Sequence, residues 1–384
     1  MSITVDVPTP GPAQATSFPA TSQAGAEDAA GRADGAPPLG AQAGAFLTEA
    51  ELATQLVGDA RQVRVLTGDR PTGPLHLGHY LGSLRNRVRL QNTGADLFVL
   101  VADYQVVTDR DAGEDITGHA LGLVADYLAT GLDPARSTVF AHSAVPALNQ
   151  LMLPLLSLVS VAELERNPTT KAEAAASGRT LSALMLTYPV HQAADILFCH
   201  ADLVPVGRDQ LPHLEVTRTV ARRFNTRYRP VFTEPRALIS DAPSVLGADG
   251  VKMSKSRGNT IPLRASADET AAIIKTFKTD TDRHITYDPE HRPEVSNLVL
   301  ITALCRGEDP HSVAEQIGSG GAAALKRQAT EAVNEHLRPL RARRAQVAGE
   351  QPLLSAILRR GAERATAEAE ATLQQVRQAM GMAY

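Results

Sequence analysis

Short apolar runs alternate with helix-spaced segments through the first half of the chain, and this alternation limits the possible folds more than any other feature. Two of the runs, Val63–Thr67 and Leu97–Ala102, are bounded by Gly or Asp, as buried parallel strands are. Between them, Leu77–Gln91 has apolar residues at helical spacing. The pattern continues with a helix at Ile116–Thr130, a strand at Thr138–Ala141 and a long helix at Ala147–Glu165. Such a succession predicts an α/β fold, with a parallel sheet covered by helices on both faces.

The two ends of the chain have a different character. Residues 1–45 are rich in Ala, Gly, Pro, Ser and Thr without apolar periodicity, which predicts a disordered, low-complexity tail. A short helix is expected at Ala45–Arg61. Farther on, the pattern from Thr187 to Asn225 is helix, the short run Leu203–Val206, then helix, and Glu269 to Met382 reads as almost entirely helical.

This pattern predicts three parts: the tail 1–45, an α/β catalytic domain 46–265 and a helical domain 266–384. The polar faces of the helical part carry a group of basic residues: Lys326, Arg327, Arg338, Arg341, Arg343 and Arg344.

Composition excludes several classes of protein. No apolar run approaches the roughly 18 residues that a membrane span needs, so no membrane partner is expected. The formal net charge of −4 argues against binding nucleic acid by bulk charge, so any such partner must meet a local basic patch. Two cysteines, Cys199 and Cys305, cannot build a disulfide framework, and a reduced, cytoplasmic setting is expected.

The first chemical motif lies between the first predicted strand and the first predicted helix. Two imidazoles, His76 and His79, stand three residues apart at a helix start, with Gly78 between them leaving room for close approach. Helix N-terminal N–H groups favour anions, and two imidazole donors added there suit a polyphosphate.

The second motif is a loop that carries two lysines, Lys252 and Lys255, before Gly258. Two ammonium groups on a mobile loop can close over phosphates and stabilise charge that develops during transfer.

Together the motifs resemble the two signatures of class I aminoacyl-tRNA synthetases, His-x-Gly-His and Lys-Met-Ser-Lys-Ser, in the right order. Three further stretches are similar to the bacterial tryptophanyl-tRNA synthetases: Leu164–Lys171, Tyr188–Leu197 and Leu203–Glu215. The resemblance covers roughly residues 61–384. It implies a Rossmann-like catalytic domain, a helical domain that meets tRNA(Trp), and a homodimer that uses L-tryptophan and ATP with Mg²⁺.

The resemblance also implies residue roles. The residues expected to act in the chemistry are His76, His79, Lys252, Lys255 and Lys171. Those expected to bind ATP are Arg70, Pro71, Thr72, Gly78, His79, Lys252, Met253, Ser254, Lys255, Ser256, Val206, Gly207 and Asp209. Those expected to bind tryptophan are Asp195, Tyr188, Gln192, Gln210, Gln105, Val204 and Val206. No protein ligand for a metal is expected, because the ATP phosphates would hold Mg²⁺.

Asp195 is the residue on which the choice of amino acid depends. An indole is a flat apolar body with one N–H donor, and an acid within an apolar helix segment can be its buried acceptor. Gln192 and Gln105 depart from the best-known bacterial pattern and resemble a variant branch that includes auxiliary forms. Three alternatives remain: a tyrosyl-tRNA synthetase, a non-catalytic paralogue that binds tRNA or a protein, and a nucleotidyltransferase that acts on a small metabolite.

Overall fold

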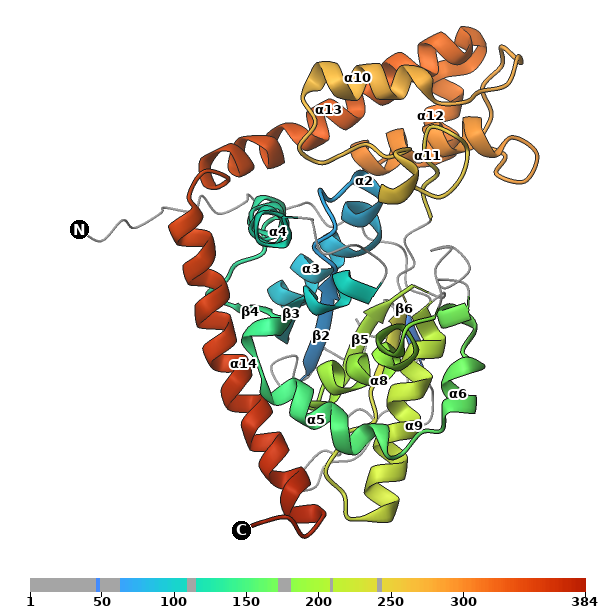
Figure 1. Cartoon of the computed structure of the whole chain (residues 1–384). Coiled ribbons are helices and arrows are strands. Elements are labelled where there is room, and N and C mark those ends of the chain that lie inside the picture. Colours follow the sequence, from blue (N-terminus) through green and yellow to red (C-terminus); the bar gives the residue numbers. More distant parts are fainter. Residues whose placement is uncertain (1–45, 49–62, 109–114, 172–180, 208–209, 240–243) are drawn as a thin grey trace, which may run out of the picture. The chain divides into compact units, whose positions relative to one another are not determined.

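The computed structural model describes residues 46–48, 63–108, 115–171, 181–207, 210–239 and 244–384 (Figure 1). The predicted tail 1–45 and most of the predicted helix Ala45–Arg61 lie outside these residues. The described part of that helix, Phe46–Thr48, is strand β1, so the helix prediction is wrong there. These residues are a strand because they pair in parallel with β6 (Arg236–Ile239), a partner that local sequence does not reveal.

Six parallel strands form one sheet in the order β1-β6-β5-β2-β3-β4. The remaining bounds are β2 (Arg64–Asp69), β3 (Asp96–Val101), β4 (Ser137–Ala141) and β5 (Leu203–Val206). The chain runs outward from β2 through β3 to β4, then crosses to β5 and β6 on the other side of β2. Ligands of such open parallel sheets bind outside the carboxyl ends of the strands where the strand order reverses, which is here between β2 and β5. The expected α/β, Rossmann-like class is confirmed.

Helices and helical turns connect and cover the strands. In the first half they are α2 (Leu77–His79), the π-helical turn η3 (Tyr80–Leu84), α3 (Arg85–Thr93), η4 (Tyr104–Thr108), α4 (Ile116–Thr130), η5 (His142–Ala144), α5 (Ala147–Leu156) and α6 (Val161–Glu165). In the second half they are α8 (Ala183–Leu197), α9 (Leu211–Arg227), η7 (Lys255–Arg257), α10 (Ala267–Thr276), α11 (Pro293–Arg306), α12 (Pro310–Ile317), η8 (Gly318–Gly320), α13 (Gly321–Val347) and α14 (Gln351–Ala379).

The predicted single helix Ala147–Glu165 is wrong, because the structure divides it into α5 and α6. The second helix begins with a capping box. The Ser160 hydroxyl accepts from the Glu163 N–H at 3.2 Å, and the Glu163 carboxylate accepts from the Ser160 N–H at 2.8 Å. These bonds satisfy N–H groups that a continuous helix would bond internally, so they favour a new start. The C-terminal part was expected to be almost entirely helical, but its segment 277–292 contains no helix.

The alternation of side chains along the strands builds two cores. On one face the strands contribute Val65, Leu97 and Val99, which belong to the same buried cluster as α4, α11 and α13. On the other face Leu66, Phe98 and Leu100 join the cluster that contains α5, α8, α9 and α14. Since successive strand residues point to opposite faces, both faces must be covered, as the near-continuous apolar runs predicted.

Helix α14 packs directly on the edge strand β4. At Gly361 a Cβ would lie 1.8 Å from the Val139 carbonyl oxygen, so only glycine permits this approach. Covering an edge strand with a helix protects it from pairing with another chain.

Arginines of α13 tie this helix to the sheet domain. Arg344 Nε donates to Asp126 Oδ1 at 2.6 Å, and Arg343 Nε donates to the Ala129 carbonyl at 2.8 Å. The other oxygen of Asp126 accepts from the Leu75 N–H at 3.3 Å, in the loop after β2. These basic residues, predicted on a polar face, therefore hold the protein's own structure. Among the described residues, no helix is both long and apolar enough to cross a membrane.

Candidate active site

The loop after β2 is anchored by a buried ion pair. Asp69 accepts from Arg87 Nη1 at 2.5 Å and from the Tyr127 hydroxyl at 2.7 Å. Burial disfavours the Asp69 carboxylate, but the Arg87 guanidinium outweighs it, and the pKa of Asp69 lies well below its ordinary value. The carboxyl end of the central strand is therefore held in place directly beneath the first motif.

The two histidines of the first motif lie side by side at the start of α2. Their ring centroids are 3.7 Å apart, and the His76 N–H points to His79 Nδ1 at 3.3 Å. A Cβ on Gly78 would lie 3.0 Å from His76 Nδ1, so a larger residue between the imidazoles would push on the His76 ring. His76 Nδ1 is buried and has no hydrogen-bond partner among the described residues, so it is available to a ligand.

Both imidazoles are neutral in this state. Burial, the neighbouring His79 and Lys255 lower the pKa of His76 to about 3. Burial lowers the pKa of His79 to about 4, in spite of the opposing charge of Asp69. The pair therefore offers N–H donors to phosphate oxygens, while the positive charge must come from lysine.

We expect the free energy of unfolding to fall as the pH drops from about 7 to about 5, because histidines in the unfolded chain gain protons that His76 and His79 do not bind when folded. Each of these two histidines lowers the free energy of unfolding by about 2 kcal/mol between pH 7 and pH 5. The free energy of unfolding of His76→Asn should therefore fall by about 2 kcal/mol less than that of the wild type over the same interval. Urea unfolding at both pH values measures the difference, and equal losses would mean that the folded His76 titrates normally.

The second motif folds back onto the first. Lys255 Nζ donates to the Gly73 carbonyl at 3.0 Å and lies 3.5 Å from the Thr72 hydroxyl. The segment that follows pairs with the helix start, since the Leu77 N–H donates to the Ile261 carbonyl at 2.9 Å. Backbone pairing thus brings the two signatures together although they are far apart in the chain.

Asn259 closes the lysine loop. Its Oδ1 accepts from the Ser254 N–H at 2.9 Å, and its amide donates to Asp249 Oδ1 at 2.7 Å. Met253 is buried and anchors the loop, whereas Lys252 is exposed. Of the other residues expected at the phosphates, Pro71 is buried, Arg70 is half-buried, Gly207 is exposed at the end of β5, and Lys171 is exposed at the end of a described segment. Asp209 and the side chain of Ser256 lie outside the described part of the chain.

The residues expected to bind the amino acid lie on α8 and β5 and in the loops beside them. Asp195 is fully buried, and Gln105 Nε2 lies 3.5 Å from its Oδ2. Val204 is buried, and Val206 and Gln210 are half-buried near the carboxyl end of β5. Gln192 is half-buried on α8. The structure therefore brings Gln105, rather than Gln192, to the carboxylate of Asp195.

Sequence reasoning missed the contacts of His213, which lies between Tyr188 and Asn167. The Tyr188 hydroxyl and His213 Nε2 are 2.6 Å apart, and His213 Nδ1 lies 3.4 Å from the Asn167 amide nitrogen. The Asn167 oxygen accepts from the Thr169 N–H at 3.0 Å, which assigns the amide nitrogen as the donor to His213. His213 therefore orients Tyr188, although no role was expected for it.

His142 is the other residue that sequence reasoning missed. Its Nε2 lies 3.0 Å from Asp195 Oδ1, and both side chains are buried. The signal that could have found it is its position, directly after the predicted strand Thr138–Ala141, where a parallel strand presents its carboxyl end.

Comparisons with known proteins agree with one another. The family described as tRNA synthetases class I (W and Y) matches residues 59–338. The tryptophan–tRNA ligase of Lactococcus lactis is 41% identical over 336 residues, which cover 83% of this chain and 98% of that protein. The tryptophan–tRNA ligase of Streptococcus agalactiae is 42% identical over the same shares. The tryptophanyl-tRNA synthetase of Campylobacter jejuni, solved in complex with ADP and tryptophan, is 30% identical, with a TM-score of 0.73 over 83% of this chain and all of that one.

Proposed function

The chain belongs to the class I tRNA synthetases for tryptophan and tyrosine, and we propose that within this family it is a tryptophan–tRNA ligase. It activates L-tryptophan with ATP to tryptophanyl-adenylate and transfers the tryptophanyl group to tRNA(Trp). The observation that carries the proposal is the contact of Lys255 with the Gly73 loop, which places a lysine beside the paired imidazoles. The intact phosphate site argues against a non-catalytic paralogue.

Activation needs no nucleophile from the protein. The tryptophan carboxylate attacks the α-phosphorus of ATP, and pyrophosphate leaves with its electron pair. Catalysis then consists of positioning the two substrates and stabilising the charge that develops on the leaving group. His76 and His79 donate to phosphate oxygens, and Lys255 and Lys252 neutralise the departing pyrophosphate. A ribose hydroxyl of the tRNA finally attacks the activated carbonyl, and AMP leaves.

Mg²⁺ fits this site as a partner of the phosphates. Among the described residues, the acid that faces the imidazoles, Asp69, is already occupied by Arg87 and Tyr127. The other charged side chains that act on His76 and His79 there are the cations Lys252, Lys255 and Arg87. We therefore propose that phosphate oxygens hold the ion, which compensates phosphate charge, and that the protein contacts the phosphates rather than the metal.

The choice of tryptophan is supported by Asp195. Its Oδ1 is buried and without a hydrogen-bond partner among the described residues, so it can accept from a ligand donor. An indole N–H is such a donor. A phenylalanine ring would leave the oxygen unsatisfied, whereas a tyrosine hydroxyl could reach it only in a slot of different depth.

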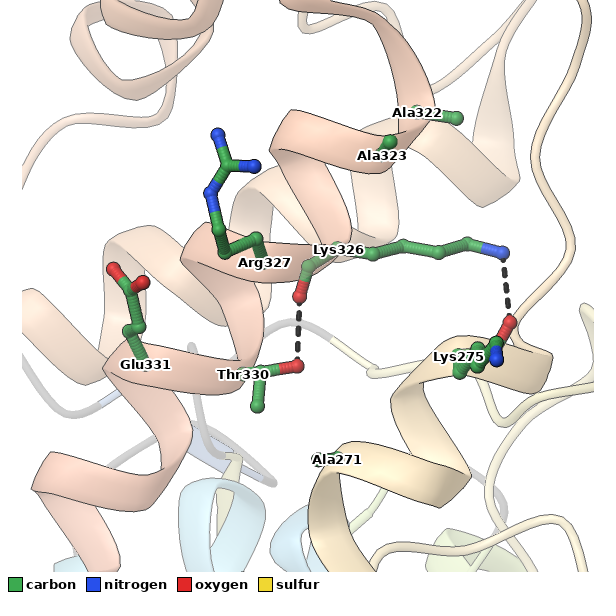
Figure 2. Close-up of a pocket in the computed structure, with 8 residues that line it drawn as sticks. All are labelled: Ala271, Lys275, Ala322, Ala323, Lys326, Arg327, Thr330 and Glu331. Carbon is green, nitrogen blue, oxygen red and sulfur yellow. Dashed lines mark hydrogen bonds between the residues drawn. The ribbon is translucent and has the colours of Figure 1, made fainter. Parts of the chain in front are cut away.

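The helical domain 266–384 is proposed to contact tRNA. Helices α10 and α13 line an open pocket of about 640 Å³ that presents three cations, Lys275, Lys326 and Arg327, and one acid, Glu331 (Figure 2). The Lys326 ammonium reaches across to the Lys275 carbonyl at 3.0 Å, and the Arg327 side chain extends outward in the same view. The protein has a net negative charge, so a local cationic surface of this kind is where the phosphate backbone of tRNA can bind.

We further propose that the protein is a cytoplasmic homodimer.

ATP–pyrophosphate exchange with tryptophan, tyrosine and phenylalanine, each as the sole amino acid, tests this function. Exchange should depend on tryptophan, followed by tryptophanyl transfer to tRNA(Trp) when tRNA is added. Exchange that depends on tyrosine would replace tryptophan by tyrosine as the substrate. The absence of exchange with all three would contradict the synthetase assignment and favour a chain that only binds its ligands.

A further inference from the structure

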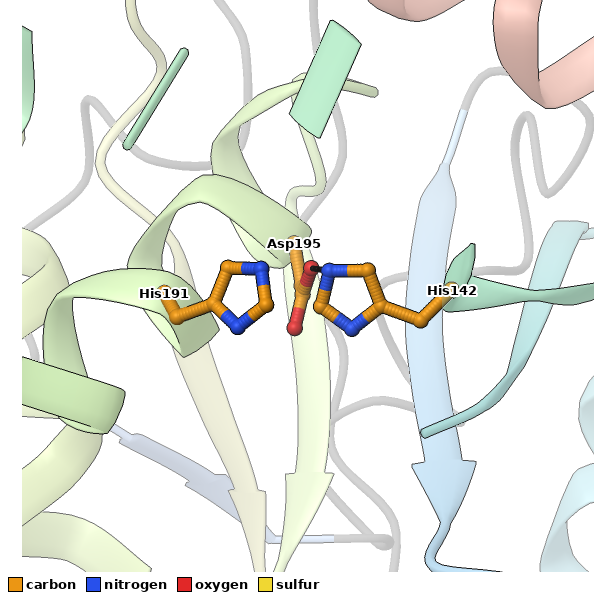
Figure 3. Close-up of side chains that lie close together, drawn as sticks. All are labelled: His142, His191 and Asp195. Atoms are coloured by element: carbon orange, nitrogen blue, oxygen red, sulfur yellow. Dashed lines mark ion pairs between the residues drawn. The ribbon is translucent and has the colours of Figure 1, made fainter. Parts of the chain in front are cut away.

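Three buried side chains from two separate segments meet at the proposed indole acceptor, Asp195. His191 and Asp195 lie one turn apart on α8, and His142 comes from η5 at the end of β4. Figure 3 shows the Asp195 carboxylate between the two imidazoles in view, with its contact drawn to His142. Each residue has a nitrogen or oxygen within 4.8 Å of the others, so a shared cation and a shared proton are both conceivable.

A hydrogen bond of His191 argues against a shared cation. The His142 and His191 rings have centroids 3.9 Å apart and are tilted by 32° to each other, and Figure 3 shows them side by side. His191 Nε2 is occupied, because it lies 3.0 Å from Asn149 Oδ1, to which it donates. This bond would have to break before His191 Nε2 could bind a cation.

His142 has unsatisfied atoms that face the carboxylate. His142 Nε2 and Asp195 Oδ1 are 3.0 Å apart but lack the alignment of a hydrogen bond, so neither has such a partner among the described residues. Both side chains are essentially inaccessible to water. Buried polar atoms left in this condition mark a place where a ligand or a small rotation completes the bonding.

We propose that His142 is a positioning residue that shares one proton with Asp195 and thereby sets the charge of the indole acceptor. This inference rests on the proposed function, in which Asp195 receives the indole N–H. In the ligand-free chain the proton is on Asp195 and His142 is neutral. When the indole N–H bonds to Asp195, the proton passes from the carboxyl oxygen to His142 Nε2, which leaves a carboxylate that accepts from the indole and His142 and has Gln105 Nε2 3.5 Å from its Oδ2. No atom is gained or lost, and the pair stays neutral overall.

The surroundings of His142 and Asp195 support this placement of the proton. Burial and the neighbouring His191 lower the pKa of His142 to about 2. Burial, together with the charge of Asp103, raises the pKa of Asp195 well above its ordinary value. Both effects keep the pair neutral without ligand, because neither charged form is solvated. A substrate donor favours the carboxylate, and the charged histidine then compensates it at short range.

The other groups that face His142 leave this exchange intact. Asp103 lies after β3 and accepts from the Ser143 N–H at 3.0 Å and from the Ser143 hydroxyl, so its charge is held by the loop. Tyr104 packs its ring edge on His142 at 5.5 Å between centroids. Burial lowers the pKa of His191 to about 4, so His191 stays neutral at physiological pH. Asp195 is thus the proton partner of His142 among these neighbours.

Exchange kinetics with a pair of isosteric substrates test the proposal. Tryptophan donates a hydrogen bond through its indole N–H, whereas 3-(benzofuran-3-yl)alanine has an oxygen at that position and can only accept. The wild type should use tryptophan far better, because His142 Nε2 accepts the proton of Asp195, and the analogue's oxygen then faces a carboxyl oxygen that has no proton to donate. His142→Leu leaves Asp195 protonated and able to donate, so the preference for tryptophan should fall by about tenfold or more. This loss should appear in the KM for tryptophan, with kcat little changed, because the reacting carboxylate is at the other end of the substrate.

Two matched variants complete the experiment. His142→Gln retains an N–H donor toward Asp195 and should restore most of the preference. His191→Phe retains an aromatic ring beside His142 and should leave the preference close to that of the wild type. Wild-type preference in a folded His142→Leu variant, with an unchanged Tm, would overturn the proposal, and so would a bound metal ion lost equally in the His142 and His191 variants. A wild type that does not activate tryptophan would contradict the proposed function instead, so the two failures are distinct.

A spectroscopic measurement reads the proton directly. In protein labelled with ¹⁵N at histidine, the His142 Nε2 signal, assigned from its absence in His142→Leu, should move from a neutral to a protonated shift when tryptophan is added. It should not move with the benzofuran analogue. A signal unchanged by saturating tryptophan would overturn the proton transfer even if the kinetic preference fell.

Discussion

Replacing Lys255 by alanine is expected to lower the kcat of tryptophan activation by about 100-fold or more, with a smaller change in the KM for tryptophan. In the ligand-free chain Lys255 Nζ bonds the Gly73 carbonyl, so the ammonium already lies beside the imidazoles that would hold the phosphates. Its charge is needed most when pyrophosphate leaves, and an interaction made mainly in the transition state appears in kcat.

A control for this variant is Arg257→Ala, which removes an exposed cation from the same helical turn, η7. Steady-state exchange at saturating tryptophan should remain near the wild-type rate. Comparable losses in both variants would mean that the overall charge of the loop matters rather than the position of Lys255. An unchanged kcat for Lys255→Ala would exclude this loop from the chemistry.

Asp195→Asn is expected to weaken tryptophan use by about 1.5–3 kcal/mol, measured as kcat/KM in the exchange reaction. Asparagine retains the volume and an acceptor oxygen but loses the charge that strengthens the bond to the indole N–H. Asp195→Ala should cost more, because the buried indole donor would then have no partner. The wild type should discriminate against phenylalanine by about 10⁴–10⁵, as pockets that read a polar group do.

The three aromatic amino acids, tested with both Asp195 variants, provide the control. A residue that reads the indole N–H should affect tryptophan strongly and phenylalanine little, so the ratio between them should shrink. A uniform loss with all substrates would assign Asp195 a structural role. An asparagine variant equal to the wild type would place the indole acceptor elsewhere.

Much of the fold could be predicted because strands and helices carry their periodicity locally. The apolar run that became β3 and the helix α4, which ends at Gly131 in the left-handed conformation, follow the predicted bounds closely. The errors arose where tertiary partners or caps decided the structure. Strand β1 depends on pairing with β6, which was itself not predicted. Ser160 and Glu163 ended the long apolar helix by capping a new one, although the pattern of the capping box was present in the sequence.

The residues of the candidate site were likewise predictable only where they form a local pattern. The two signatures were evident because each is a compact local pattern, and the structure adds that a Cβ on the glycine between His76 and His79 would crowd the His76 ring. The roles of Lys171 and Asp209 remain predictions. His142 and His213 were missed because neither belongs to a local pattern, and each is identified only by the side chain it meets, Asp195 or Tyr188.

The chemical groups, the order of most strands and helices along the chain, and the resemblance that suggested the reaction are all properties of the local sequence. Which groups meet depends on the folded chain: Lys255 lies with the Gly73 loop, and His142 lies with Asp195. Local sequence cannot predict these contacts, because periodicity records which face of an element is buried, not which distant element covers it. In a parallel sheet, strand order and register bring the carboxyl ends of separate strands to one edge, and the side chains that follow those strands become neighbours there.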